Sequence, residues 1–229
     1  MIITEQDVAI LERDTHIGKW VKDSKRLDFD QSALKAYLPF FKEGDVLLNI
    51  GANIGSYSYA FKDKASKIIC FEPSIELFEC LKYNLEKYPN IELYNEAISD
   101  MNELYEIICL DDNTALSHIK ISKQSNRITR TIDSYSFDKI NFILMDCEGY
   151  EPKILFGAQN TISKHQPILV IEINIYTLEA YGYNKNSIYN FLDQNNYQYR
   201  NIYQDNDMEG DQFDIICFPK ERLKDIWIS

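Results

Sequence analysis

Leu48-Asn49-Ile50-Gly51-Ala52-Asn53-Ile54-Gly55 is the stretch of sequence that decides the fold. It joins the apolar run DVLLNI, residues 45–50, to the segment SYSYAFKDK, residues 56–64. An apolar run followed by a glycine turn is typical of a buried strand that leads into a helix. Glycine has no Cβ, so a ligand can approach the backbone of such a turn, and the next helix presents free N–H groups. A strand–helix turn without a ligand has the same pattern, so the stretch predicts a fold more firmly than a site.

The same pattern repeats along the rest of the chain. Apolar runs typical of strands alternate with amphipathic runs typical of helices, and the expected strands are residues 45–50, 67–72, 91–99, 141–146, 167–173, 197–203 and 213–218. This order predicts an α/β fold with a Rossmann-like, seven-stranded, mostly parallel sheet, helices on both faces and one antiparallel strand.

Two regions fall outside this alternation. Residues 103–135 alternate polar and apolar positions and are expected to add β-structure. Residues 1–44 are expected to form a small helical cap over one end of the sheet, with a short helix first, a polar stretch over 16–30 and a second helix from residue 31. Residues 45–229 are then the main domain.

An acidic residue ends the second expected strand. Glu72 lies 21 residues after Gly51, where a carboxylate can accept hydrogen bonds from both ribose hydroxyls of an adenosine. The turn is G-A-N-I-G rather than the G-x-G-x-x-G that holds a pyrophosphate. S-adenosyl-L-methionine has no phosphate, and its zwitterionic end suits the polar Asn53, so it fits better than a dinucleotide. Its adenine is expected near residues 96–99, where the third strand ends.

Composition limits the partners. The 229 residues carry a formal net charge of −12, and no basic stripe is visible, so a nucleic-acid partner is not expected. The five cysteines form no C-x-x-C pair and lie mostly in apolar runs, which indicates free thiols in a reducing compartment. No apolar stretch is long enough to cross a bilayer, and the N-terminus is too polar for a signal peptide. The protein is expected to be soluble and cytoplasmic.

Five segments together resemble the FkbM-type branch of class I S-adenosylmethionine-dependent methyltransferases. They are NIGANIGSY, FEP, EAISD, MDCEGYE and ILVIEIN, in this order between residues 45 and 174. The resemblance implies a cofactor at the carboxyl ends of the first three strands. It also implies O-methylation, in many members of a sugar hydroxyl on a glycan, a glycolipid or an antibiotic.

By that similarity the cofactor-binding residues are Asn49, Gly51, Asn53, Gly55, Glu72, Ser74, Ala97, Ile98 and Asp146. Glu72 is expected to hold the ribose, and Ala97 and Ile98 to flank the adenine. Asp146 matches the D-x-E-G motif of the family. Asn49 departs from the family, because the first motif usually carries an acid there; an amide brings no charge, which predicts weaker cofactor binding.

The chemistry of methyl transfer points to further residues. The acceptor oxygen has to lie about 3 Å from the sulfonium methyl. A sugar hydroxyl is a poor nucleophile, so a base or a metal ion should help to remove its proton. Asp146 and Glu172 end two neighbouring strands at the carboxyl edge of the sheet, where ligands bind. Asp146 is the first candidate for the base.

Alternatives to this lone base stay open. A Mg²⁺ or Mn²⁺ ion held by Asp146, Glu172 and Asn174 would suit oxygen ligands. His118 lies in the 103–135 insertion and is another candidate base, although a lone histidine in a polar loop is more often a surface residue. Glu148 fits a role in the site and a place as an acid at a helix N-terminus equally well. For Glu151 the helix N-terminus is the better explanation, because the helix dipole favours an acid there.

The acceptor is left open as well. A deoxyhexose such as rhamnose or fucose is suggested by the resemblance alone. A protein or nucleic-acid methyltransferase is the alternative enzyme, and Asn49 favours a catalytically silent scaffold domain. N-methyltransferases usually carry an Asn/Asp-Pro-Pro-aromatic motif where this chain has M-D-C-E-G. The chain could also be one module of a larger glycan-modifying protein, and its oligomeric state cannot be read from the sequence.

Overall fold

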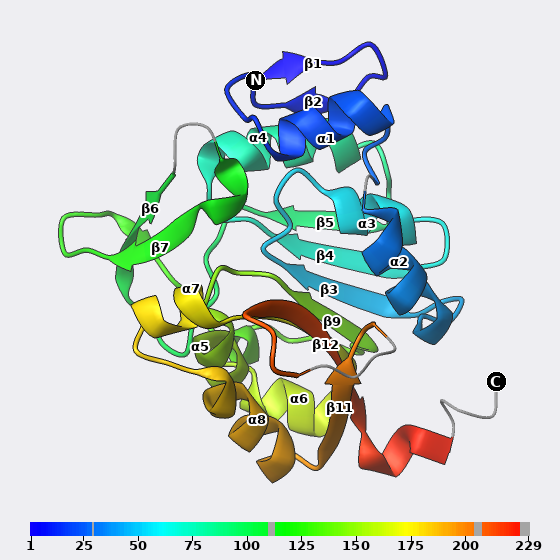
Figure 1. The fold of residues 1–229 in the computed structure, drawn as a ribbon, viewed down its shortest axis with the longest axis vertical. Helices are drawn as coiled ribbons and strands as arrows, with labels where there is room; N and C mark the ends of the chain where they lie inside the picture. Colours follow the sequence, from blue (N-terminus) through cyan, green and yellow to red (C-terminus); the bar gives the residue numbers. More distant parts are fainter. Residues whose placement is uncertain (29, 110–112, 204–207, 225–229) are drawn as a thin grey trace.

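The computed structural model describes residues 1–28, 30–109, 113–203 and 208–224. Its centre is a seven-stranded sheet in the spatial order β11-β12-β10-β9-β3-β4-β5 (Figure 1). Neighbouring strands are parallel except at β12, which is antiparallel to β10 and β11. The strands are β3 (Val46–Ile50), β4 (Lys67–Phe71), β5 (Ile91–Tyr94), β9 (Phe142–Met145), β10 (Ile168–Asn174), β11 (Tyr197–Asn201) and β12 (Gln212–Pro219). The predicted fold class, with seven strands and one antiparallel member, is confirmed.

Helices cover both faces of the sheet. Successive residues of a strand point to opposite faces, so Leu47 of β3 packs into one core and Leu48 into the other. The first layer contains α2 (Gln31–Tyr37), α3 (Ser56–Phe61) and α4 (Ile75–Leu85), and the second α5 (Glu151–Phe156), α6 (Gln159–His165) and α8 (Lys185–Gln194). Because both faces are covered, β3 is buried along its whole length, which explains why its residues are apolar except for Asn49.

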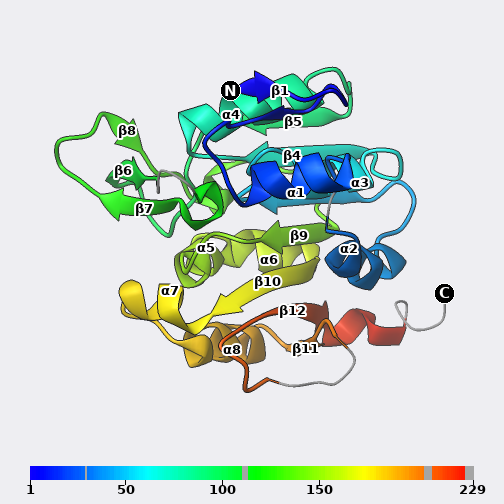
Figure 2. The same ribbon diagram turned by 45° about the horizontal axis from the view of Figure 1, so that its top comes forward.

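The 103–135 insertion forms a small sheet of its own. Strands β6 (Leu104–Ile108), β7 (His118–Ile121) and β8 (Arg127–Ile128) pair antiparallel in the order β7-β6-β8. This sheet lies beyond the carboxyl ends of β4 and β5 (Figures 1 and 2). The prediction of added β-structure is confirmed, and the position of the insertion places it beside the edge where ligands bind.

The N-terminal segment differs from the expected helical cap. Strands β1 (Ile2–Ile3) and β2 (Ala9–Ile10) form a hairpin where a short helix was expected, and α1 (Ile17–Ser24) lies within the polar stretch, for which no helix was predicted. Residues 8–11 are all buried, which suits an extended strand more than an amphipathic helix. In α1, Ile17 and Val21 are buried one turn apart, and this single pair anchors an otherwise polar helix. Helix α2, which was expected, joins the first helical layer rather than only the end of the sheet.

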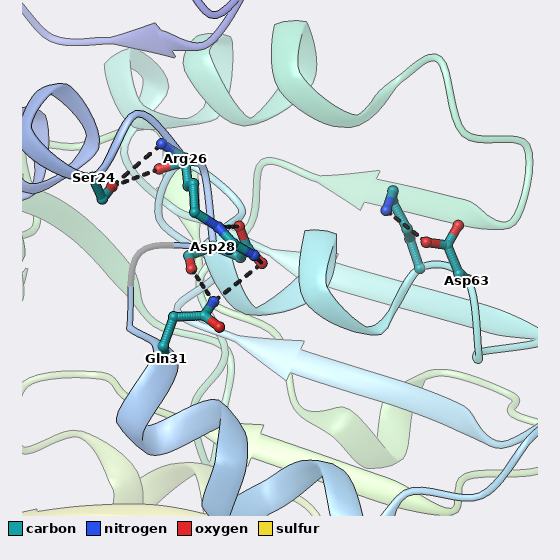
Figure 3. A network of polar contacts seen from close by, with 6 residues as sticks. Ser24, Arg26, Asp28, Gln31 and Asp63 are labelled. Atoms are coloured by element: carbon teal, nitrogen blue, oxygen red, sulfur yellow. Dashed lines mark hydrogen bonds and ion pairs between the residues drawn. The ribbon is translucent and has the colours of Figure 1, made fainter.

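A polar network fixes the chain between α1 and α2 (Figure 3). Arg26 and Asp28 form an ion pair with a distance of 2.6 Å between Nη2 and Oδ2. Gln31 Nε2 donates a hydrogen bond of 2.6 Å to the carbonyl oxygen of Asp28. Asp30 then caps α2 by accepting from the backbone N–H of Ala33. These contacts fix where α2 begins, and with it the position of Asp30.

Several short elements were not anticipated. Helix α7 (Ile175–Ala180) directly follows β10, and Asn174 caps it by accepting from the N–H groups of Tyr176 and Thr177. The 3₁₀ helices are η1 (Leu38–Phe40), η2 (Thr114–Leu116), η3 (Ile132–Ser134) and η4 (Lys220–Arg222). Among the described residues, none of the helices combines the length and the apolar character needed to span a lipid bilayer.

Asn84 of α4 fastens the N-terminal hairpin to the glycine turn. Its Oδ1 accepts from the N–H of Ala9 at 2.7 Å, and its Nδ2 donates to the carbonyl oxygens of Ala9 and Ile54 at 3.1 and 2.9 Å. Asn84→Ala leaves these buried groups without a partner, so we expect the free energy of unfolding to fall by about 2–4 kcal/mol. Urea denaturation measures it, with Asn102→Ala at an exposed position as the control. If Asn84→Ala lowered the free energy of unfolding no more than the control does, Asn84 would not fasten the hairpin.

Candidate active site

The register of the parallel strands places four residues in one row across the carboxyl edge of the sheet. Ile50 pairs with Phe71 of β4 and with Met145 of β9, and Met145 pairs with Ile171 of β10. The next residue of each strand therefore lies in the same row, and these residues are Gly51, Glu72, Asp146 and Glu172. Residues far apart in the sequence meet here because parallel strands end at a common edge.

Gly51 makes a close approach between two turns possible. Its φ is +80°, and a Cβ on it would lie 2.0 Å from the carbonyl oxygen of Asp146. The sequence suggested that this glycine admits a ligand to the backbone. In the structure its missing side chain also leaves space for the backbone of the turn after β9.

A first cavity opens along this row. It runs between the turn after β3, the start of α4, the small sheet and the turn after β9. Its lining residues are Ile50, Gly51, Asn53, Phe71, Glu72, Pro73, Ser74, Leu77, Glu96, Ile98, Ile107, Thr114, Ser117, His118, Ile119, Asp146, Cys147, Glu148, Tyr150 and Ile154. The structure thus brings together six of the predicted cofactor-binding residues: Gly51, Asn53, Glu72, Ser74, Ile98 and Asp146.

Three predicted cofactor-binding residues lie outside this lining. Asn49 is fully buried, and its Nδ2 donates to Ser58 Oγ at 2.8 Å. Gly55 packs against Leu85 of α4, and Ala97, which follows β5 in the sequence, is buried in the core. Each is one layer behind the cavity wall, so any effect of Asn49 on a ligand is exerted through the glycine turn.

Glu72 is held rigidly in the first cavity. Its Oε2 accepts from the N–H of Asn53 at 2.9 Å, and its Oε1 accepts from the N–H of Ser74 at 2.8 Å. Burial raises the pKa of the Glu72 carboxyl to about 7, although these two hydrogen bonds lower it. Glu72 therefore ties the turn after β3 to the start of α4 and has a protonation state that changes near neutral pH.

A second cavity adjoins the first on the side of α1 and α2. The two share Gly51, Asn53, Asp146 and Glu148. Its lining includes five acidic residues and, among the described residues, neither Lys nor Arg: the acids are Asp30, Asp146, Glu148, Glu172 and Asp214. A site with this charge favours cations and hydrogen-bond donors.

Three of these acids form a tight cluster. One carboxylate oxygen each of Asp146, Glu148 and Glu172 lies within 4.8 Å of the other two. Burial, together with the charge of the neighbouring acids, raises the pKa of Glu172 and of Glu148 to about 8. Burial and Glu172 also hold the pKa of Asp146 well above its usual range. Like charges this close disfavour full ionisation, so the three carboxyls together retain protons at neutral pH.

The turn that carries two of these acids is unusual. Glu148 adopts a φ of +54°, which is uncommon for a residue other than glycine or asparagine. Glu151 Oε1 accepts from the N–H of Cys147 at 2.7 Å and of Gly149 at 3.4 Å. The expectation that Glu151 belongs to the helix N-terminus agrees with its place as the first residue of α5, and its carboxylate holds the turn that presents Glu148.

The structure also places residues that sequence reasoning missed. Gln212 Nε2 donates to Glu172 Oε1 at 2.7 Å, and Asp214 accepts from the hydroxyl of Tyr37. Both lie on β12, whose antiparallel register sets them beside β10. The apolar run around Asp214 predicted the strand but gave no sign that its one acid faces a site.

The expected candidate base in the insertion, His118, lies at a different part of the site. It lines only the first of the two cavities, whereas all three acids of the cluster line the second. Thr114 of the insertion donates a hydrogen bond to Asp14 of the N-terminal segment. This contact joins two distant segments at the rim of the first cavity.

Comparison with known proteins identifies the family of the chain. The sequence model of the methyltransferase FkbM domain matches residues 49–199. The hexuronic acid methyltransferase AglP of Haloferax volcanii is 26% identical over 150 residues, which cover 62% of this chain and 61% of AglP. The match therefore spans less than two thirds of that relative.

Two solved structures share the fold. Methyltransferase FkbM from Methylobacillus flagellatus KT has 21% sequence identity and a TM-score of 0.54, over 78% of this chain and 44% of that protein. SMU.1697c from Streptococcus mutans, solved in complex with SAH, has 11% identity and a TM-score of 0.52, over 82% of this chain and 96% of that protein.

The family match covers most of the strands and both turns that line the cavities, and it agrees with the resemblance of the sequence segments. The chain belongs to the FkbM family of methyltransferases.

Proposed function

We propose that this methyltransferase transfers a methyl group from S-adenosyl-L-methionine to a hydroxyl of a sugar. The observation that carries the proposal is the junction of the two cavities at Gly51, Asn53, Asp146 and Glu148. A donor in the first cavity and an acceptor in the second would meet at this junction, as an in-line displacement requires.

The first cavity suits the donor. Glu72 lies at the end of β4, where its carboxylate can accept from the ribose hydroxyls. Apolar side chains farther along the cavity, among them Ile98 and Ile107, offer a surface for the adenine. The sulfonium and ammonium groups of the donor would lie toward the acids of the second cavity, which favour positive charge.

The second cavity suits a hydroxylated acceptor. The carboxylate of Asp146 lies at the junction, where the reacting hydroxyl would be, and that of Glu172 lines the second cavity within 4.8 Å of it. In the reaction the acceptor oxygen forms a bond to the methyl carbon while the sulfur–methyl bond breaks. The electron pair stays on sulfur and yields SAH, and the hydroxyl proton passes to the Asp146 carboxylate in its ionised form. AglP acts on a hexuronic acid, so uronic acids are the first sugars to test.

Transfer of labelled methyl groups tests the proposed function. The protein is incubated with methyl-tritiated S-adenosyl-L-methionine and glycosides of hexuronic acids, rhamnose or fucose, and in parallel with RNA and with protein. We expect label on a sugar, in an ether linkage that survives mild alkali. Label released by mild alkali would indicate a carboxyl ester and contradict the hydroxyl as acceptor. Label on RNA or protein alone would contradict the sugar.

The pKa of Glu72 gives the donor site a characteristic pH dependence. Ribose hydroxyls donate to the ionised carboxylate, so below a pKa of about 7 the ligand has to displace a proton. We expect the affinity for SAH, measured by calorimetry, to fall about tenfold between pH 7.5 and pH 6.

The variant Glu72→Gln tests whether Glu72 binds the ribose and causes the pH dependence of the affinity for SAH. The variant should bind SAH about tenfold more weakly at pH 7.5, because a charge-assisted hydrogen bond is lost, and its affinity should no longer change between pH 7.5 and 6. Glu79→Gln, at an exposed position of α4, serves as the matched control and should behave as the wild type. Wild-type affinity and pH dependence in Glu72→Gln would remove Glu72 from the ribose site.

A further inference from the structure

The acid cluster of Asp146, Glu148 and Glu172 contains buried oxygens with no partner. Glu172 is only 7% exposed, yet its Oε2 has no hydrogen-bond partner among the described residues, and the same is true of Glu148 Oε2. An unpaired buried carboxylate oxygen is costly. Both side chains line the second cavity, so a ligand in that cavity can satisfy them.

We propose that Asp146, Glu148 and Glu172 bind one divalent cation, Mg²⁺ or Mn²⁺, which in turn binds oxygens of the acceptor. The inference rests on the proposed function, because the second cavity is the proposed acceptor site. Three carboxylates match the hard oxygen ligands that these ions prefer. With one oxygen from each, about three of the six positions of an octahedral ion stay open for water or acceptor.

The surroundings hold the three ligands in place. Gln212 Nε2 donates to Glu172 Oε1 and thereby fixes the carboxylate with Oε2 left free. Glu151 holds the turn that carries Glu148. Outer contacts of this kind orient ligands in metal sites. Asn174, which the sequence suggested as a third ligand, instead uses its Oδ1 to cap α7, and Glu148 takes that place.

The cation also explains how an acidic cavity can admit its acceptor. Five carboxylates line the second cavity, and no Lys or Arg is found there among the described residues, so an anionic sugar would be repelled. A bound divalent ion reverses the local charge and offers open positions to a carboxylate or to neighbouring hydroxyls. The inferred acceptor is therefore a sugar with a carboxylate or two adjacent oxygens that can chelate the ion.

Binding of Mn²⁺ to the whole chain tests the site without any need for turnover. Electron paramagnetic resonance of free Mn²⁺ is followed during titration of the metal-free protein. We expect one site per chain, with the affinity at least about tenfold weaker in Glu172→Gln and in Glu148→Gln, since each removes one ligand. Asp30→Asn is the matched control: it removes one charge from the same cavity but no ligand, and asparagine still caps a helix. Its affinity should stay within about threefold of wild type.

Calorimetry with SAH in EDTA separates this inference from the proposed function. If SAH binds but millimolar Mn²⁺ does not, the metal site is wrong while the methyltransferase proposal stands. If SAH fails to bind, the proposed function is wrong. Equal loss of Mn²⁺ affinity in Asp30→Asn and Glu172→Gln would indicate a general field effect and overturn the site.

A crystal structure of the wild-type protein with Mn²⁺ tests the site even if the variants fail to fold. Crystals soaked in Mn²⁺ should show one anomalous peak within about 2.3 Å of an oxygen from each of Asp146, Glu148 and Glu172. The absence of a peak there would overturn the inference whatever the variants do.

Discussion

The close contact between Gly51 and the carbonyl oxygen of Asp146 is the constraint on which the site depends. No side chain fits between these two backbones, because a Cβ at position 51 would lie 2.0 Å from that oxygen. The contact brings the turn after β3 against the turn after β9, and it forms the shared wall of the two cavities. The two cavities can adjoin here only because residue 51 is a glycine. The packing of the two turns therefore requires this glycine as much as access for the proposed donor and acceptor does.

Buried acids give the site its second characteristic. Glu72, Glu148 and Glu172 all have pKa values raised by burial, and a folded protein that holds acids in this way gives up stability at higher pH. Perturbed pKa values of this kind gather at functional sites. The proposed ligands of the two cavities, a sulfonium donor and a divalent ion, are both cations. Each would offset part of the cost of keeping these carboxylates together.

The sequence predicts the sheet well because its central strands are mostly apolar runs separated by turns, and strand register then sets Gly51, Glu72, Asp146 and Glu172 in one row. The sequence predicts poorly those short elements and contacts that depend on residues far away in the chain. The hairpin β1–β2 depends on hydrogen bonds from Asn84, more than 70 residues away. The interaction of Gln212 with Glu172 depends on an antiparallel register that spacing alone does not reveal. Glu148 could be assigned only once the structure showed that its carboxylate lies within 4.8 Å of those of Asp146 and Glu172.

A crystal structure of the chain with SAH tests the central claim most directly. The account expects the ribose hydroxyls to lie within hydrogen-bond distance of the Glu72 carboxylate. It also expects the sulfur to lie at the junction of the cavities, facing Asp146. SAH bound elsewhere, or oriented with its sulfur away from the second cavity, would contradict the account.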